Sequence, residues 1–136
     1  MPRPGTRPLG TRPLKSKPIP VYSTPGDWVA LLVFPYIFSP QGEWIGWVTS
    51  DRQVYDVDGI YVGWVTSEPR ILRKRTYELE LDRQPSPPNP GRIRPPGTVP
   101  LPPMMASLPF EVVDVMEEDP DRLHTLDHGE LKEDVD

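Results

Sequence analysis

The sequence predicts an all-β domain of four β-hairpin repeats with pseudo-four-fold symmetry, which form a shallow barrel or flower. Three observations predict this fold. Three segments, starting at residues 21, 37 and 54, align without a gap, and a degenerate fourth copy starts at residue 71. Each opens with strand-forming residues followed by a turn. The Pro residues, 21 in total, lie mostly outside the repeats and indicate extended flanking arms. Self-similarity at an even spacing indicates one supersecondary unit copied around or along an axis.

Each repeat is expected to be a β-hairpin. The first strands open on two apolar residues, Val21-Tyr22, Ile37-Phe38, Val54-Tyr55 and Ile71-Leu72. Three turn residues and a glycine follow in the first three copies, at Gly26, Gly42 and Gly59. Glycine at this place favours a positive φ, as in a hairpin with a bulge. The fourth copy has Thr76 there, so its turn is expected to differ.

The second strands carry apolar residues at their third and fifth positions: Val29 and Leu31, Ile45 and Trp47, Val62 and Trp64, Leu79 and Leu81. A period of two predicts that this face points to the main core. The opposite face is polar in the fourth copy but apolar in the first three, so something must cover it, or it lines a groove or binds a partner. The small residues Ala30, Gly46 and Gly63 share one repeat position and indicate crowding near the symmetry axis.

The flanks divide the chain further into a Pro-rich basic arm (1–20), the hairpin domain (21–82), a Pro-rich linker (83–107) and an acidic C-terminal segment (108–136). The Pro-rich stretches cannot bury enough apolar surface to fold alone and are expected to be extended or disordered. Residues 84–103 are interpreted as a semi-rigid spacer around or away from the barrel, with a polyproline-type ligand as the alternative. The apolar residues 108–116 are candidates for covering the small core. Asp119 followed by Pro120 predicts a short helix near 120–128.

Composition excludes several classes. Without cysteine there is no disulfide and no thiol chemistry. The basic N-terminus has no apolar stretch behind it, and the most apolar run, 28–38, is too short to span a bilayer. We expect a soluble cytoplasmic protein, or one peripheral to the membrane. No phosphate-binding loop, nucleophile elbow or carboxylate pair within one motif occurs, so we expect no enzyme, no catalytic residues and no cofactor.

The motif Val-Tyr-Asp-x-Asp-Gly-x-Tyr-Val-Gly-Trp-Val at 54–65, recurring as hairpins, resembles the four-fold β-flower proteins. These are small bacterial domains whose hairpins radiate around a shallow barrel. The resemblance covers roughly 21–82. Copy one departs from it with Ala30-Leu31 in place of Gly-Trp, and copy four lacks both glycines. The resemblance implies a shape similar to the tubby C-terminal domain, whose relatives bind membrane phosphoinositides, and it carries over no catalytic residue.

Two groups are candidate ligand-binding residues. Trp28, Trp44 and Tyr61 lie on the second strand face and could stack on a sugar, lipid or cation, or could fill the core. The basic residues Arg73, Lys74 and Arg75 could bind phosphates at the tip of the fourth hairpin, or could form a solvated turn.

From these features we expect a non-catalytic binding or scaffold module that acts through protein contacts, including self-association. The alternative is peripheral binding of anionic lipid or another amphipathic ligand. Nucleic acid is not favoured, because the acidic residues 111–136, at a net charge of −9, compete for the basic arm and no base-reading motif occurs.

A metal site is not predicted. His124, Asp127 and His128 would share one face if 120–128 were helical, and a His pair at this spacing can begin a metal site. A complete site needs further ligands, and only Glu130 is near in sequence. A solvated helix face is the favoured interpretation.

Overall fold

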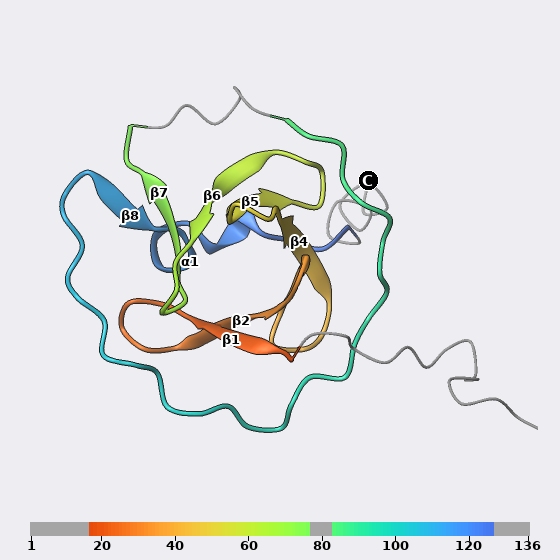
Figure 1. Cartoon of the computed structure of the whole chain (residues 1–136), viewed down its shortest axis with the longest axis horizontal. Helices are drawn as coiled ribbons and strands as arrows, with labels where there is room; N and C mark the ends of the chain where they lie inside the picture. The colour runs from red at the N-terminus through yellow and green to blue at the C-terminus, as the bar shows by residue number, and fades with distance from the viewer. Residues whose placement is uncertain (1–16, 77–82, 127–136) are drawn as a thin grey trace, which may run out of the picture.

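The protein is described by a computed structural model over residues 17–76 and 83–126. In these ranges eight strands form one antiparallel sheet in the order β1 to β8. The strands are β1 (Ile19–Tyr22), β2 (Trp28–Val33), β3 (Tyr36–Phe38), β4 (Trp44–Val48), β5 (Gln53–Asp56), β6 (Tyr61–Val65), β7 (Ile71–Lys74) and β8 (Val112–Asp114). The sheet curls into a half-barrel (Figure 1), which confirms the predicted all-β class.

The first three repeats form the expected hairpins: β1–β2, β3–β4 and β5–β6. Their turn glycines have positive φ angles: 107° at Gly26, 89° at Gly42 and 87° at Gly59. The strand register shifts in each hairpin, as a bulge requires. Residues with a Cβ rarely adopt such φ values, so the backbone conformation of the turn explains why glycine recurs there.

The fourth repeat is completed by a distant part of the chain. β7 pairs with β6 on one side and with β8 on the other. Both edges of β7 are therefore hydrogen-bonded, and the strand next to it comes from Val112–Asp114. The return strand expected at 77–81 lies outside the described residues.

A buried polar network joins the two edges of the sheet. Asp114, on β8, is 1% exposed, and its Oδ2 accepts hydrogen bonds from the Thr24 backbone N at 2.6 Å and from Thr24 Oγ1 at 2.5 Å. The buried Arg70 donates from Nη1 to Thr24 Oγ1 at 3.0 Å and from Nε to Glu68 Oε1 at 2.7 Å. The hydrogen bond from Arg70 lowers the pKa of Glu68. These side chains, together with a backbone hydrogen bond from Tyr22 N to Pro69 O at 3.1 Å, link the first hairpin to the fourth unit.

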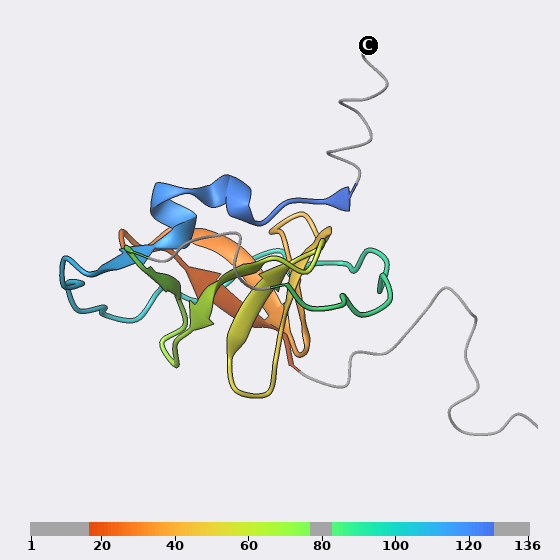
Figure 2. The same ribbon diagram turned by 90° about the horizontal axis from the view of Figure 1, so that it is seen from above.

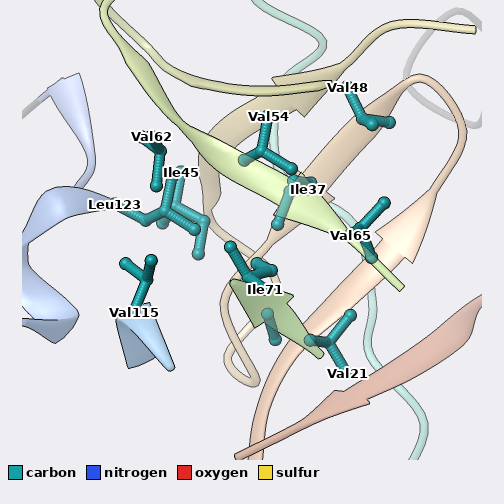
Figure 3. Close-up of a cluster of buried hydrophobic side chains, with 11 residues drawn as sticks. Val21, Ile37, Ile45, Val48, Val54, Val62, Val65, Ile71, Val115 and Leu123 are labelled. Atoms are coloured by element: carbon teal, nitrogen blue, oxygen red, sulfur yellow. The ribbon is translucent and has the colours of Figure 1, made fainter. Parts of the chain in front are cut away.

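Two apolar clusters fill the domain. The first contains Val21, Ala30, Ile37, Ile45, Val48, Val54, Val62, Val65, Ile71, Val115 and Leu123 (Figure 3). The second contains Leu31, Val33, Phe38, Trp44, Trp47, Tyr55 and Val57, with Ile93 packed against it. The residues on both faces of the strands that the sequence showed to be apolar on both faces are therefore buried or half-buried by the chain itself.

The period-two assignment of the second strands is wrong. Ile45 lies in the first cluster while Trp47, two residues later on β4, lies in the second. Between them is Gly46, where an added Cβ would lie 2.6 Å from the backbone O of Tyr55. Ile37 pairs with Gly46 and Phe38 with Trp44, so Ile45 is the extra residue of a β-bulge, and residues two apart across it no longer share a face. The expected crowding is confirmed at Gly46 and is greater at Gly63, and Ala30 at the same repeat position is fully buried.

The C-terminal segment covers one side of the half-barrel (Figure 2). A short helix is present, but it is α1 (Val115–Glu118), directly after β8, because the Asp114 side chain caps it. The helix expected at 120–128 is wrong over its described part. Pro120 begins only the single 3-10 turn η1 (Pro120–Arg122), and the following Leu123 inserts into the first cluster.

Candidate functional site

The Pro-rich residues 84–111, here called the rim segment, run around the outside of the hairpins (Figure 1). Residues 84–109 form neither helix nor strand. The segment meets the third hairpin first, where Gln84 N donates to Gly59 O at 2.8 Å. It then meets the second, where Ile93 N donates to Gly42 O at 3.0 Å. The rim segment is therefore attached at the turn glycines.

The same relation continues around the molecule. The side chain of Pro102 lies against Gly26, 3.4 Å from where a Cβ would stand. Arg75, in the fourth unit, donates its backbone N to the backbone O of Glu111 at 2.7 Å. The contacts at 84, 93, 102 and 111 are nine residues apart, so the rim segment repeats in step with the four-fold domain.

The burial of the rim segment has a period of three. Half-buried residues recur at Pro87, Pro90 and Ile93, and again at Val99, Pro102, Met105 and Leu108, whereas Pro96 is exposed and Ser86 and Pro95 are half-buried outside this period. A polyproline II helix has three residues per turn, so residues three apart share an edge. One edge of the rim segment thus faces the hairpins.

The opposite edge carries exposed apolar side chains. Leu101 is 91% exposed and Met104, three residues later, is 99% exposed. Phe110, near the end of the rim segment, is also exposed, and the Arg75 guanidinium lies 4.2 Å above its ring centroid. An ordered segment with outward-facing apolar side chains is a feature of binding surfaces.

The aromatic candidates are packed within their own hairpins. Trp44 is buried in the second cluster, and its Nε1 donates to the backbone O of Gly46 at 2.7 Å. The half-buried Trp28 makes the equivalent bond to the backbone O of Ala30 at 2.8 Å. Tyr61, also half-buried, donates from its hydroxyl to the Gln53 side chain at 2.7 Å. Their polar atoms thus bond within the hairpins, and the three do not form one open platform.

The basic candidates have different surroundings. Arg75 donates from Nε to the backbone O of Phe110 at 2.6 Å, and its Nη2 lies 3.9 Å from Glu118. The Nε and Nη1 atoms of Arg73 are buried and donate no hydrogen bond to any of the described residues. Lys74 is exposed. The structure therefore leaves Lys74 and part of Arg75 as the accessible cations of this group.

A small pocket of about 120 Å³ lies between the second hairpin, the rim segment and the C-terminal segment. Trp44 forms one wall, and Asn89 and Leu126 form others. Arg92 bridges across it with Nη1 3.1 Å from Glu43 Oε2. Ligand pockets usually enclose several hundred Å³, so this one suits a small group rather than a whole ligand.

A cluster missed at the sequence level brings together Asp56, Asp58 and His124. His124 Nε2 lies 3.7 Å from Asp56 Oδ2 and 3.8 Å from Asp58 Oδ2. The ligand atoms of all three are within 4.8 Å of one another, a spacing that fits a metal ion. The sequence pattern groups His124 with Asp127 and His128, which lie outside the described residues. Only the turn of hairpin three has the Asp-x-Asp-Gly pattern, which is the available signal.

No helix in residues 17–76 and 83–126 has the length and apolar character needed to cross a membrane. The model of a protein family described as "4-fold beta flower protein" matches residues 15–114. This range includes most of the chain, and it extends through the rim segment to β8. The comparisons with curated proteins and with solved structures gave no match.

Proposed function

The chain belongs to the 4-fold beta flower family, and from this fold and its rim segment we propose that it is a non-catalytic, cytoplasmic protein-binding module. The binding surface is the outward edge of the rim segment around Leu101 and Met104. The observation that carries the proposal is the exposure of these two side chains, 91% and 99%, on one edge of a polyproline-type segment. The partner is a protein with an aromatic-lined groove of the kind that takes polyproline helices.

The hairpins hold this part of the rim segment in place. The hydroxyl of Tyr22 donates to the backbone O of Pro100, and Pro102 packs at Gly26. These contacts lie on the inward edge, so a partner can reach the outward edge without displacing them. A segment that is already extended loses less conformational freedom on binding, which favours affinity.

The apolar second faces of the strands are not the proposed surface. Ile93 of the rim segment packs against the second cluster, and Leu123 completes the first. Since the chain itself packs against these faces, the outward edge of the rim segment is the surface that offers exposed apolar side chains to a partner. Self-association through the rim is a possible outcome of the same test.

The test is an NMR titration of the full chain with isolated domains that bind polyproline segments, such as WW and SH3 domains. We expect amide shifts centred on the residues around Leu101 and Met104. The double variant Leu101→Ser with Met104→Ser should lose binding while keeping its melting temperature, since both side chains are exposed. Phe34→Ser, which replaces a 52% exposed residue away from the rim segment, is the matched control and should bind normally. Binding retained by the rim variant, or absent with every domain, refutes the proposal.

Binding to anionic lipid is a second proposal, supported by one arrangement. The ring of Phe110 is 77% exposed and lies under Arg75, with Lys74 exposed close by in the chain. Aromatic rings and cations together favour the membrane interface. Flotation with vesicles containing phosphatidylserine tests it at low and high salt. Binding that weakens with salt and is lost on replacing Arg73–Arg75 by Ser supports lipid binding, and equal flotation of both chains refutes it.

A further inference from the structure

We propose that Asp56, Asp58 and His124 form a binding site for a divalent transition metal ion such as Zn²⁺. The site joins the turn of the third hairpin to the C-terminal segment. It is separate from the outward edge of the rim segment and does not depend on the proposed protein-binding role.

The distances fit a metal of this class. Zinc binds imidazole nitrogen and carboxylate oxygen at about 2.0–2.2 Å, so two ligands of a tetrahedral site are about 3.4 Å apart. His124 Nε2 lies 3.7 Å from Asp56 Oδ2 and 3.8 Å from Asp58 Oδ2. Both distances exceed the spacing in a tetrahedral zinc site by about 0.3–0.4 Å, so the ligands must move closer together on binding. The mixed set of one nitrogen and two oxygens favours a transition metal over Ca²⁺ or Mg²⁺, which prefer oxygen alone.

Asp56 is held ready for this role. Its side chain is 4% exposed, and Oδ1 accepts hydrogen bonds from the backbone N of Asp58 and of Ile60, both at 2.9 Å. These bonds fix the carboxylate, and Oδ2 points toward His124. A buried carboxylate next to a second carboxylate is costly unless a cation compensates it. A metal ion at this place would supply the positive charge that compensates the two carboxylates.

His124 has the arrangement expected of a metal ligand. Its Nδ1 lies 3.1 Å from the backbone O of Thr125. In the tautomer protonated at Nδ1, this nitrogen donates to Thr125 and the Nε2 lone pair faces the two carboxylates. Metal-bound histidines commonly donate their other ring N–H to a carbonyl in this way, which fixes the ring orientation.

The preceding residue anchors the histidine. Leu123 is buried in the first cluster and lies close to Gly46. A metal held by hairpin three and His124 would therefore act as a cross-link between residues far apart in the sequence, and metal binding should stabilise the folded chain. Asp58 and His124 are partly exposed, so an ion can enter and keep a further ligand position open to water.

The test is titration of the full chain with Zn²⁺, by calorimetry and by melting temperature. We expect one ion per chain, a higher melting temperature, and a changed ring resonance of His124 in NMR spectra. Asp58→Asn and His124→Gln should each weaken binding at least tenfold. The matched controls are Asp121→Asn, which changes an exposed acid near His124, and His128→Gln, which changes the other histidine. Both should bind as the unmodified chain does.

Three results would overturn the proposal. Without Zn²⁺ binding, the cluster is only a pair of carboxylates beside a histidine that holds the C-terminal segment. If binding survives His124→Gln but not His128→Gln, the ion sits elsewhere on the acidic segment. Equal binding of Mg²⁺ or Ca²⁺ would contradict a site that depends on the imidazole.

Discussion

Replacing Gly63 by alanine tests the crowding at the centre of the domain. An added Cβ would lie 2.0 Å from the backbone O of Leu72 on the neighbouring strand β7, where ordinary contact begins at 3.4 Å. The atom it meets belongs to the backbone, so no side-chain rotation can relieve the contact. The β6–β7 pairing must therefore open locally. We expect Gly63→Ala to be strongly destabilising.

The magnitude follows from two contributions. Overpacking of a filled interior costs about 1–3 kcal/mol. Loss of one or two backbone hydrogen bonds between the strands adds about 1 kcal/mol each. We expect a total near 3 kcal/mol. At roughly 4–8 °C per kcal/mol for a domain of this size, the melting temperature should fall by about 12 °C or more.

Two other glycines separate crowding from backbone strain. At Gly97 an added Cβ meets nothing within 4 Å, so Gly97→Ala should be neutral or stabilising by up to about 1 kcal/mol. Gly91 is equally open but has a φ of 81°, so Gly91→Ala should cost about 1–2 kcal/mol from conformation alone. Urea unfolding followed by tryptophan fluorescence measures all three. A Gly63→Ala chain as stable as Gly97→Ala would refute the reasoning.

Two further predictions concern the polar network. Asp114→Ala leaves the Thr24 backbone N and the N-terminus of α1 without their hydrogen-bond acceptor. The free energy of unfolding, measured with urea, should therefore fall by about 3 kcal/mol or more. A fall of less than about 1 kcal/mol would contradict the role of Asp114. The hydrogen bond from Arg70 lowers the pKa of Glu68 in the folded state. The contribution of ionised Glu68 to folding stability is therefore complete above the ordinary glutamate pKa of about 4.3, and it is lost as the pH falls through the lowered pKa. Glu68→Gln should therefore flatten the acid side of the stability–pH curve, and an unchanged slope would contradict this.

The hairpins were predictable because their determinants are local. A positive φ at Gly42 and the polar residue Ser39, whose Oγ accepts from the backbone N of Glu43 at 3.2 Å, lie within one turn. Such short-range features act before the rest of the chain is placed. The same holds for the small residues, because their recurrence at one position indicates a shared constraint.

The residues of the candidate site were harder to predict from the sequence. Trp44 has one sequence pattern whether it faces a ligand or the core, and only the packing of the second cluster shows that it is buried. His124 was assigned to a helical face, whereas its neighbour Leu123 is drawn into the first cluster and ends regular structure there. The proximity of His124 to Asp56 follows from that packing and from no spacing in the sequence.

The sequence by itself determined three hairpins, their glycine turns and the crowded axis, since each depends on residues within one repeat or on comparison between repeats. Only the tertiary structure decided that β8 pairs with β7, that the rim segment joins the turn glycines at intervals of nine residues, and that Asp56 meets His124. These contacts connect residues far apart in the chain. They form because the folded hairpins leave apolar surfaces that other parts of the chain must cover. A local sequence pattern does not indicate which surfaces these are.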